Sequence, residues 1–150
     1  MSDADEVVAI MIVLLVDGEQ TRFALLTADG RINRMGSRGG DAAPDTFDRD
    51  MFIGMADEDL FQQLRSRMTR GVNEFLGHHL TEANPVGKPC KLTVGVKYAS
   101  GREAASIWSY GSESGAPHPE VVTFTMEVEA VRITDPWFQA QKAIARQSQA

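Results

Sequence analysis

The side chains best suited to bind a metal ion lie in the stretch GHHLTEA, residues 77–83. If this stretch is helical, His78 and Glu82 are one turn apart and share one face of the helix. Imidazole and carboxylate groups are common zinc ligands, but a zinc site takes three or four of them. Cys90 or His118 would have to complete the set, and neither spacing matches a zinc motif. His78 and Glu82 are therefore incomplete metal candidates, and we expect no metal or other cofactor.

Other patterns that could carry chemistry are also incomplete. The stretch MGSRGGDAAP, residues 35–44, has the glycines of a phosphate-binding loop but lacks its Gly-Lys-Ser/Thr ending. The stretch DTFDRD, residues 45–50, offers carboxylates for calcium without the spacing or the closing Glu of an EF-hand. No Gly-x-Ser-x-Gly motif occurs, and Cys90 has no base beside it in the sequence. Since no catalytic motif is complete, we expect a protein that is not an enzyme.

The composition limits the partners and the compartment. The chain has 150 residues, which is most simply one domain covering residues 1–150. Its formal net charge of −6 argues against binding to nucleic acid or to an anionic membrane surface. Cys90 is the only cysteine, so an internal disulfide is impossible and a reducing, cytoplasmic location is expected.

The run VVAIMIVLLV, residues 7–16, is apolar throughout and lies between Glu6 and Asp17. A membrane-spanning helix needs about 20 such residues, so this run is too short. Its acidic lead-in also differs from the basic start of a secretion signal. Most of its residues are β-branched, which favours a strand. A strand that is apolar on both sides needs cover on both, from a second layer or a second subunit.

Turn signals and hydrophobic periodicity divide the rest of the chain. They predict strands at 21–26 and 32–35, an exposed loop at 36–50, a helix at about 57–76, a hairpin at 90–110, an exposed loop at 111–119, a strand at 121–133 and a helix at about 136–147. We therefore expect an α+β fold of order βββα-βββα. Its sheet is mainly antiparallel with five or six strands, and one long helix packs on a face.

Three of these elements depend on different patterns. In the helix at about 57–76, apolar residues recur every three or four positions after a capping Asp57. Residues 121–133 instead alternate between apolar and polar side chains, as an exposed strand does. Asp135 followed by Pro136 is typical of a helix start, which places the C-terminal helix after that strand.

The outer face of the hairpin is unusual. If Ser100 and Gly101 form a two-residue turn, Tyr98 pairs with Glu103, and one face of the hairpin combines small side chains with two aromatic rings. We predict that a partner binds this face through Thr93, Gly95, Ala104, Ser106, Trp108 and Tyr110. A turn one residue longer would shift the register and undo this assignment. The occupant could be the C-terminal helix of the same chain, another protein or second copy, or a small molecule.

These observations favour a non-enzymatic, intracellular protein-interaction or self-associating domain that binds through a sheet face and forms a homodimer. The alternative is a small-molecule-binding protein or a modest enzyme with a pocket between the sheet and the long helix. In that case the loop at 36–50 would act as a lid. His78, Glu82 or Cys90 would supply the polar groups of the pocket.

Overall fold

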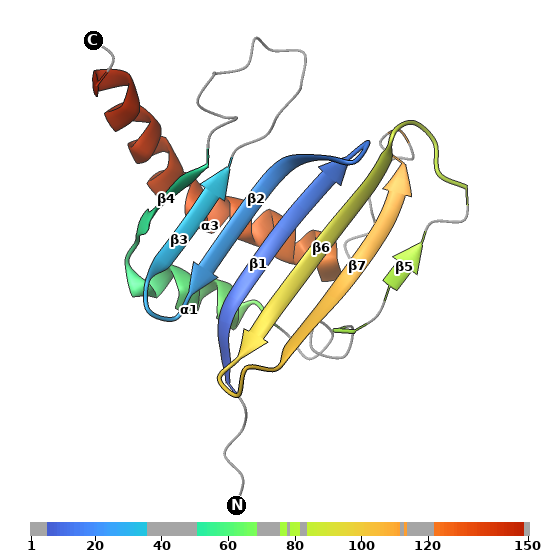
Figure 1. Ribbon diagram of the computed structural model, residues 1–150, viewed down its shortest axis with the longest axis horizontal. Coiled ribbons are helices and arrows are strands. Elements are labelled where there is room, and N and C mark those ends of the chain that lie inside the picture. Colours follow the sequence, from blue (N-terminus) through green and yellow to red (C-terminus); the bar gives the residue numbers. More distant parts are fainter. Residues whose placement is uncertain are drawn as a thin grey trace, which may run out of the picture.

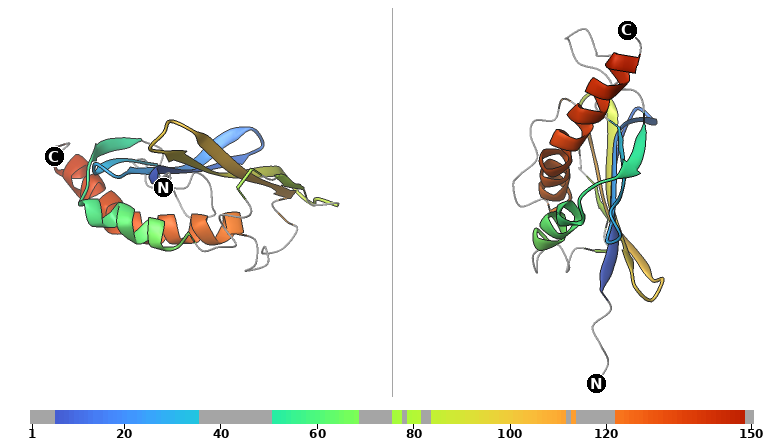
Figure 2. Two further views of the ribbon diagram at one scale, coloured as in Figure 1. Left: turned by 90° about the horizontal axis from the view of Figure 1, so that it is seen from below. Right: turned by 90° about the vertical axis from the view of Figure 1, so that its left-hand side faces the viewer.

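The computed structural model describes residues 6–35, 51–68, 76–77, 79–81, 84–111, 113 and 122–148. In this part of the chain the strands form one sheet, and two helices lie against one of its faces (Figures 1 and 2). The strands are β1 (Val7–Val16), β2 (Glu19–Thr27), β3 (Arg31–Met35), β4 (Phe52–Met55), β5 (His79–Thr81), β6 (Pro89–Tyr98) and β7 (Glu103–Gly111). The helices are α1 (Glu58–Ser66) and α3 (Val122–Ser148).

The order of strands across the sheet is β4-β3-β2-β1-β6-β7-β5. Every neighbouring pair is antiparallel except β5 with β7, which is parallel. The α+β class and the mainly antiparallel sheet predicted from the sequence are therefore confirmed.

Strand β1 lies at the centre of the sheet, between β2 and β6. Successive side chains of a strand point to opposite faces. Ile10 and Ile12 point toward the helices and are buried, whereas Met11 and Val13 point to the opposite face and are half-buried. The predicted strand is confirmed, but in the described part of the chain the helices cover only one of its two apolar sides (Figure 2).

The core fills the space between the sheet and the two helices. Helix α1 begins after Asp57, whose side chain accepts a hydrogen bond from the backbone N–H of Asp59, and it buries Phe61 and Leu64. The strands and α3 contribute Ile10, Ile12, Ala24, Leu26, Ile32, Leu92, Val94, Val96, Trp108, Met126, Ala130 and Ile133.

The strand predicted at 121–133 is wrong, because residues 122–133 belong to helix α3. The alternation of apolar and polar side chains there coexists with a second pattern, in which Met126, Ala130 and Ile133 follow a helical spacing. All three side chains are buried against the sheet. Packing of this stripe stabilises the helix, and local alternation does not decide the outcome.

The helix predicted at about 136–147 is the C-terminal part of α3, and Pro136 lies inside that helix and does not start it. Proline has no N–H, so it cannot donate to the carbonyl one turn earlier. The hydroxyl of Thr134 lies close to this position and donates to the carbonyl of Ala130 at 2.6 Å.

The helix predicted at about 57–76 is shorter than expected. Helix α1 ends at Ser66, and the backbone N–H groups of Arg67 and Met68 bond to carbonyls three residues earlier, each at 3.0 Å. Such tight bonds are typical of a last helical turn. Residues 69–75 lie outside the described part of the chain. The long helix on the sheet is therefore α3 and not α1.

The predicted order βββα-βββα is also wrong, since the described elements follow the order ββββα-βββα. The sequence analysis missed β4 and β5, which have only 4 and 3 residues. The predicted loop at 36–50 lies outside the described residues, as does most of the one at 111–119. In that second loop, Gly111 still belongs to β7 and Glu113 is an exposed turn residue.

Candidate functional site

The register of the β6–β7 hairpin differs from the prediction. Lys97 pairs with Glu103, and Gly95 pairs with Ala105. The N–H of Tyr98 bonds to the carbonyl of Arg102 at 2.8 Å, so the turn between them has three residues, 99–101, one more than predicted. The predicted two-residue turn is therefore wrong, and the longer turn moves every β7 side chain to the other face.

As a result, the six predicted partner-binding residues lie on both faces of the sheet. Thr93 and Gly95 of β6 lie on the face opposite the helices, on the side where Met11 lies. The four residues of β7 lie on the helix side, where they are buried or half-buried: Ala104, Ser106, Trp108 and Tyr110. The structure therefore does not bring the predicted set together on one surface.

Trp108 is a core residue, with 7% of its surface exposed. Its ring stacks on Tyr110 at a centroid distance of 4.0 Å. Burial raises the pKa of Tyr110 to about 12, and the nearby Cys90 and Glu127 act in the same direction. The phenol is therefore neutral at physiological pH. Burial also raises the pKa of the Cys90 thiol, so this cysteine is a poor nucleophile.

Two acidic residues of α3, Glu127 and Glu129, form ion pairs. Glu127 pairs with Arg22 of β2, and its side chain is 7% exposed. Glu129 accepts hydrogen bonds from Arg132 at 2.6 and 3.0 Å, and Arg67 lies 3.7 Å away. Glu127 and Glu129 therefore each have a cationic neighbour, as structural charges do, while Asp135 of the same helix accepts a hydrogen bond from Gln139 at 3.2 Å.

The described residues do not test the predicted metal candidates. His78 and Glu82 lie outside the described residues. His79 is described, and its Nε2 lies 2.8 Å from the hydroxyl of Ser109 on the neighbouring strand. Within the described ranges, no group of three His, Cys, Asp or Glu side chains could hold a metal ion.

The sheet face opposite the helices, which we call the open face, is the candidate functional surface. It carries Ala9, Met11 and Val13 of β1, Phe23 and Leu25 of β2, Arg31 and Asn33 of β3, and the odd-numbered residues of β6 and β7. The pairing places five of its residues in one row across the strands: Asn33, Leu25, Met11, Gly95 and Ala105. No member of this row carries a charge, and four of the five are apolar or lack a side chain.

The open face extends to the edge strand β4. Ile53 pairs with Asn33 and Met55 pairs with Arg31, so both apolar side chains lie on this face. Ile53 is 74% exposed and Met55 is 64% exposed. Large apolar side chains that lie together on a surface often mark a contact with another molecule.

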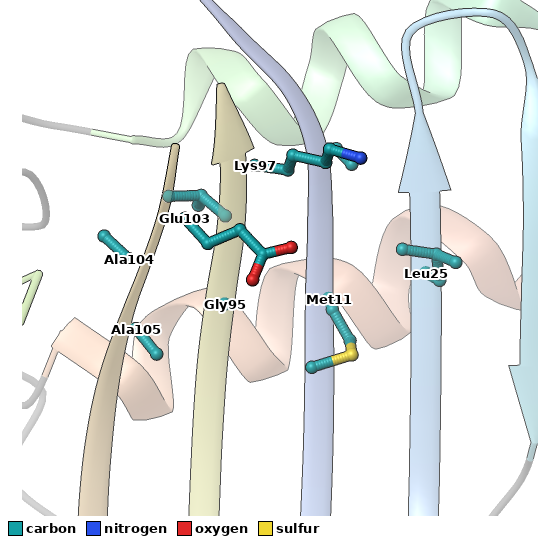
Figure 3. A pocket seen from close by; sticks show the side chains of 9 residues that line it. Met11, Leu25, Gly95, Lys97, Glu103, Ala104 and Ala105 are labelled. Carbon is teal, nitrogen blue, oxygen red and sulfur yellow. The ribbon is translucent and has the colours of Figure 1, made fainter. Parts of the chain in front are cut away.

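A shallow hollow of about 390 Å³ lies in the open face where Gly95 and Ala105 meet (Figure 3). Met11 and Leu25 stand on one side of it, and Lys97 and Glu103 lie at one end. The hollow exists because Gly95 has no side chain and Ala105 has only a methyl group. Its lining is mainly apolar, so it can hold an apolar group of another molecule.

The sequence contained a signal for this surface that was not used. In the sequence Phe23 and Leu25 alternate with Arg22 and Ala24, and residues 7–16 are apolar on both sides of the predicted strand. Placing these two strands side by side would have joined Leu25 to Met11. The wrong hairpin register directed attention to Trp108 in place of Ala105.

Comparison with protein-family models, with curated proteins and with solved structures produced no match. Among the described residues, neither helix is long and apolar enough to cross a membrane. Any functional assignment therefore depends on the geometry of the open face.

Proposed function

We propose that this chain is a non-enzymatic, self-associating protein, and that two copies form a homodimer through their open faces. The observation that supports this is that, in the described part of the chain, the helices cover only one of the two apolar sides of β1. Ile10 and Ile12 are buried by the helices, whereas Met11 and Val13 of the same strand lie on the open face. A central strand that is apolar on both sides gains stability when a second layer covers its free side.

The size of the open face suits a stable dimer. Its four neighbouring long strands, β2, β1, β6 and β7, have 9 or 10 residues each. At ordinary strand spacing they cover roughly 600 Å² in projection. Strands β3 and β4 extend this surface on one side. A standard stable interface buries about 800 Å² on each partner, which is close to what this face offers.

The distribution of charge favours a second copy as the partner. The chain carries a net charge of −6, so most of its surfaces repel another copy. The central row of the open face, from Leu25 to Ala105, has no charged side chain. Two copies can therefore bring their central rows together without placing like charges in contact there.

The compartment is part of the same proposal. Cys90 is the only cysteine of the chain and it is buried. Dimerisation therefore relies on packing and needs no disulfide, which fits a protein that works in the reducing cytoplasm.

The hollow beside Gly95 supports a second candidate, a small-molecule-binding protein. Its volume of about 390 Å³ lies within the range of small-ligand sites. This hollow lies on the open face, whereas the pocket expected from the sequence would lie between the sheet and a helix. A dimer would close the hollow, so the two candidate functions exclude each other at this surface.

The test is the mass of the protein in solution as a function of concentration, measured by analytical ultracentrifugation. We expect a dimer of the 150-residue chain. Leu25→Glu places a carboxylate in the central row, and burying that charge should weaken the dimer by about 100-fold or more. The matched control is Ile144→Glu on α3, which changes an exposed apolar residue outside the open face.

The control should dimerise as the unmodified chain does. A chain that stays monomeric at high micromolar concentration would overturn the proposal. Equal loss of dimer in Leu25→Glu and Ile144→Glu would overturn it as well, because the open face would then have no special role. A monomer that binds an apolar dye competitively with small ligands at Gly95 would favour the second candidate.

A further inference from the structure

Side-chain size changes from large to small along the central row of the open face. In the central row, Met11 pairs with Leu25 on β2 and with Gly95 on β6, and Gly95 pairs with Ala105 on β7. The row therefore has two large side chains on β1 and β2 and two very small ones on β6 and β7. We call Met11 and Leu25 the ridge, and Gly95 with Ala105 the trough (Figure 3).

The trough is open space on the surface of the sheet. A Cβ atom built on Gly95 would lie 3.5 Å from Cε of Met11, which is an ordinary contact distance. The Met11 side chain therefore borders the trough, and the hollow of about 390 Å³ remains open beyond it. The ridge and the trough have similar lengths because each spans two neighbouring strands.

A homodimer with two-fold symmetry presents the same surface from both copies, so that surface must be complementary to itself. A rotation by half a turn about an axis parallel to the strands, between β1 and β6, exchanges β1 with β6 and β2 with β7. Since the residues of the row keep their position along the strands, each ridge then faces the trough of the other copy.

We infer that the proposed dimer has this two-fold axis, so that Leu25 of each copy packs over Ala105 of the other and Met11 packs over Gly95. This inference rests on the proposed function and adds the arrangement of the two sheets. It also fits the usual packing of two sheets, whose strands align within about 30°.

Other symmetric placements leave the sizes unmatched. An axis perpendicular to the strands, through the row, would place Met11 against Met11 and Gly95 against Gly95. An axis between β6 and β7 would place the trough against itself, with Gly95 over Ala105. Both arrangements leave a void in the interface, and voids in a packed apolar layer are costly.

The inferred axis also places the charged residues without conflict. Lys97 would lie over Ala9 of the other copy, because Ala9 is its partner in the β1–β6 pairing. Glu103 pairs with Lys97 within its own chain, at the end of the trough. The aliphatic part of Lys97 can cover Ala9 while its ammonium group stays in water.

Exchange of large and small residues tests the inference. Ala105→Leu fills the trough and should weaken the dimer by about 100-fold, because two leucines then occupy the same place. Leu25→Ala removes part of the ridge and should weaken it by about 10-fold. The double variant carries a trough at residue 25 and a ridge at residue 105, so it should dimerise within about 10-fold of the unmodified chain. Circular dichroism and thermal unfolding of each variant show that the chain is folded.

A second measurement does not depend on affinity. Leu25→Cys and Ala105→Cys chains are mixed and oxidised, while the native thiol at Cys90 is buried. The mixture should form a disulfide-linked dimer. Neither chain alone should do so, because residue 25 lies roughly 14 Å from its own copy across the inferred axis. A cysteine at Ile144 on α3 serves as the unlinked control.

The results separate the two proposals. A chain that dimerises through the open face, but shows no recovery in the double variant, overturns the inferred axis and leaves the proposed function intact. If the Ala105→Cys chain links efficiently to itself, the inferred axis is likewise overturned and the proposed function stays intact. A chain that never dimerises overturns both.

Discussion

The two faces of the sheet use the same strands for different purposes. Ile10 and Met11 are neighbours in β1, yet Ile10 has no exposed surface and lies in the core, while Met11 lies on the open face and is half-buried. On the helix side, packing against α1 and α3 already satisfies the apolar surface. On the open side, equally apolar residues lie without a helix in the described part of the chain. An apolar strand therefore indicates that both of its sides should be buried, but it does not show which part of the protein, or which partner, covers each side.

Polar groups also differ between the two faces. The helix side contains the ion pair of Arg22 with Glu127, and the buried Arg34, which donates to Thr134 at 2.8 Å. Ions in such places need partners, since an unpaired buried charge is costly. The central row of the open face contains no ion. The helix side is therefore suited to hold one chain in one conformation, and the open face is suited to apolar contact.

The strongest test of this contrast compares neighbouring residues of β1. Ile10→Ala should lower the free energy of unfolding by about 4 kcal/mol, because it creates a cavity in a fully packed core. Met11→Ala on the open face should lower it by about 1 kcal/mol or less. Urea unfolding at low protein concentration measures both values without a contribution from dimerisation. Equal losses would show that something covers the open face within one chain.

A second test concerns the ion pair on the helix side. Arg22→Met leaves the carboxylate of Glu127 buried without this cation, so the free energy of unfolding should fall by about 3 kcal/mol. Adding Glu127→Met should recover most of this loss, because the unpaired charge is removed together with its partner. A double-mutant cycle from urea unfolding gives the coupling between the two side chains. Additive losses would contradict a structural role for the pair.

The smallest expected effect is at Ser106, a β7 residue on the helix side with 1% of its surface exposed. Within the described part of the chain, its hydroxyl oxygen has no hydrogen-bond partner. Ser106→Ala removes this polar atom and should raise the free energy of unfolding by up to about 1 kcal/mol. A clear loss of stability in thermal unfolding would show that the hydroxyl is hydrogen-bonded in solution. The matched control is Ser109→Ala, whose hydroxyl lies 2.8 Å from His79.

Local sequence patterns correctly predicted the elements that depend least on packing against distant parts of the chain. The strand at residues 7–16 followed from β-branched residues, and the start of α1 followed from the cap at Asp57. Residues 122–133 were predicted as a strand because apolar and polar side chains alternate there. The same residues also have the spacing of a helix, and the structure shows a helix. In the hairpin, the sequence analysis placed Gly95 on the outer face, and the structure places it there too. Ala105 was missed because the turn is one residue longer than assumed, which shifts the register by one residue.

The sequence by itself determined that the chain folds as an α+β protein with an antiparallel sheet, since side-chain branching, turn residues and periodicity act locally. It also determined that β1 is apolar on both sides. Only the tertiary structure decided which side the helices cover, that residues 122–148 form a helix, and that Met11 and Leu25 stand beside Gly95 and Ala105. These features depend on strand register and on contacts between distant segments, and a shift of one residue in register exchanges the two faces.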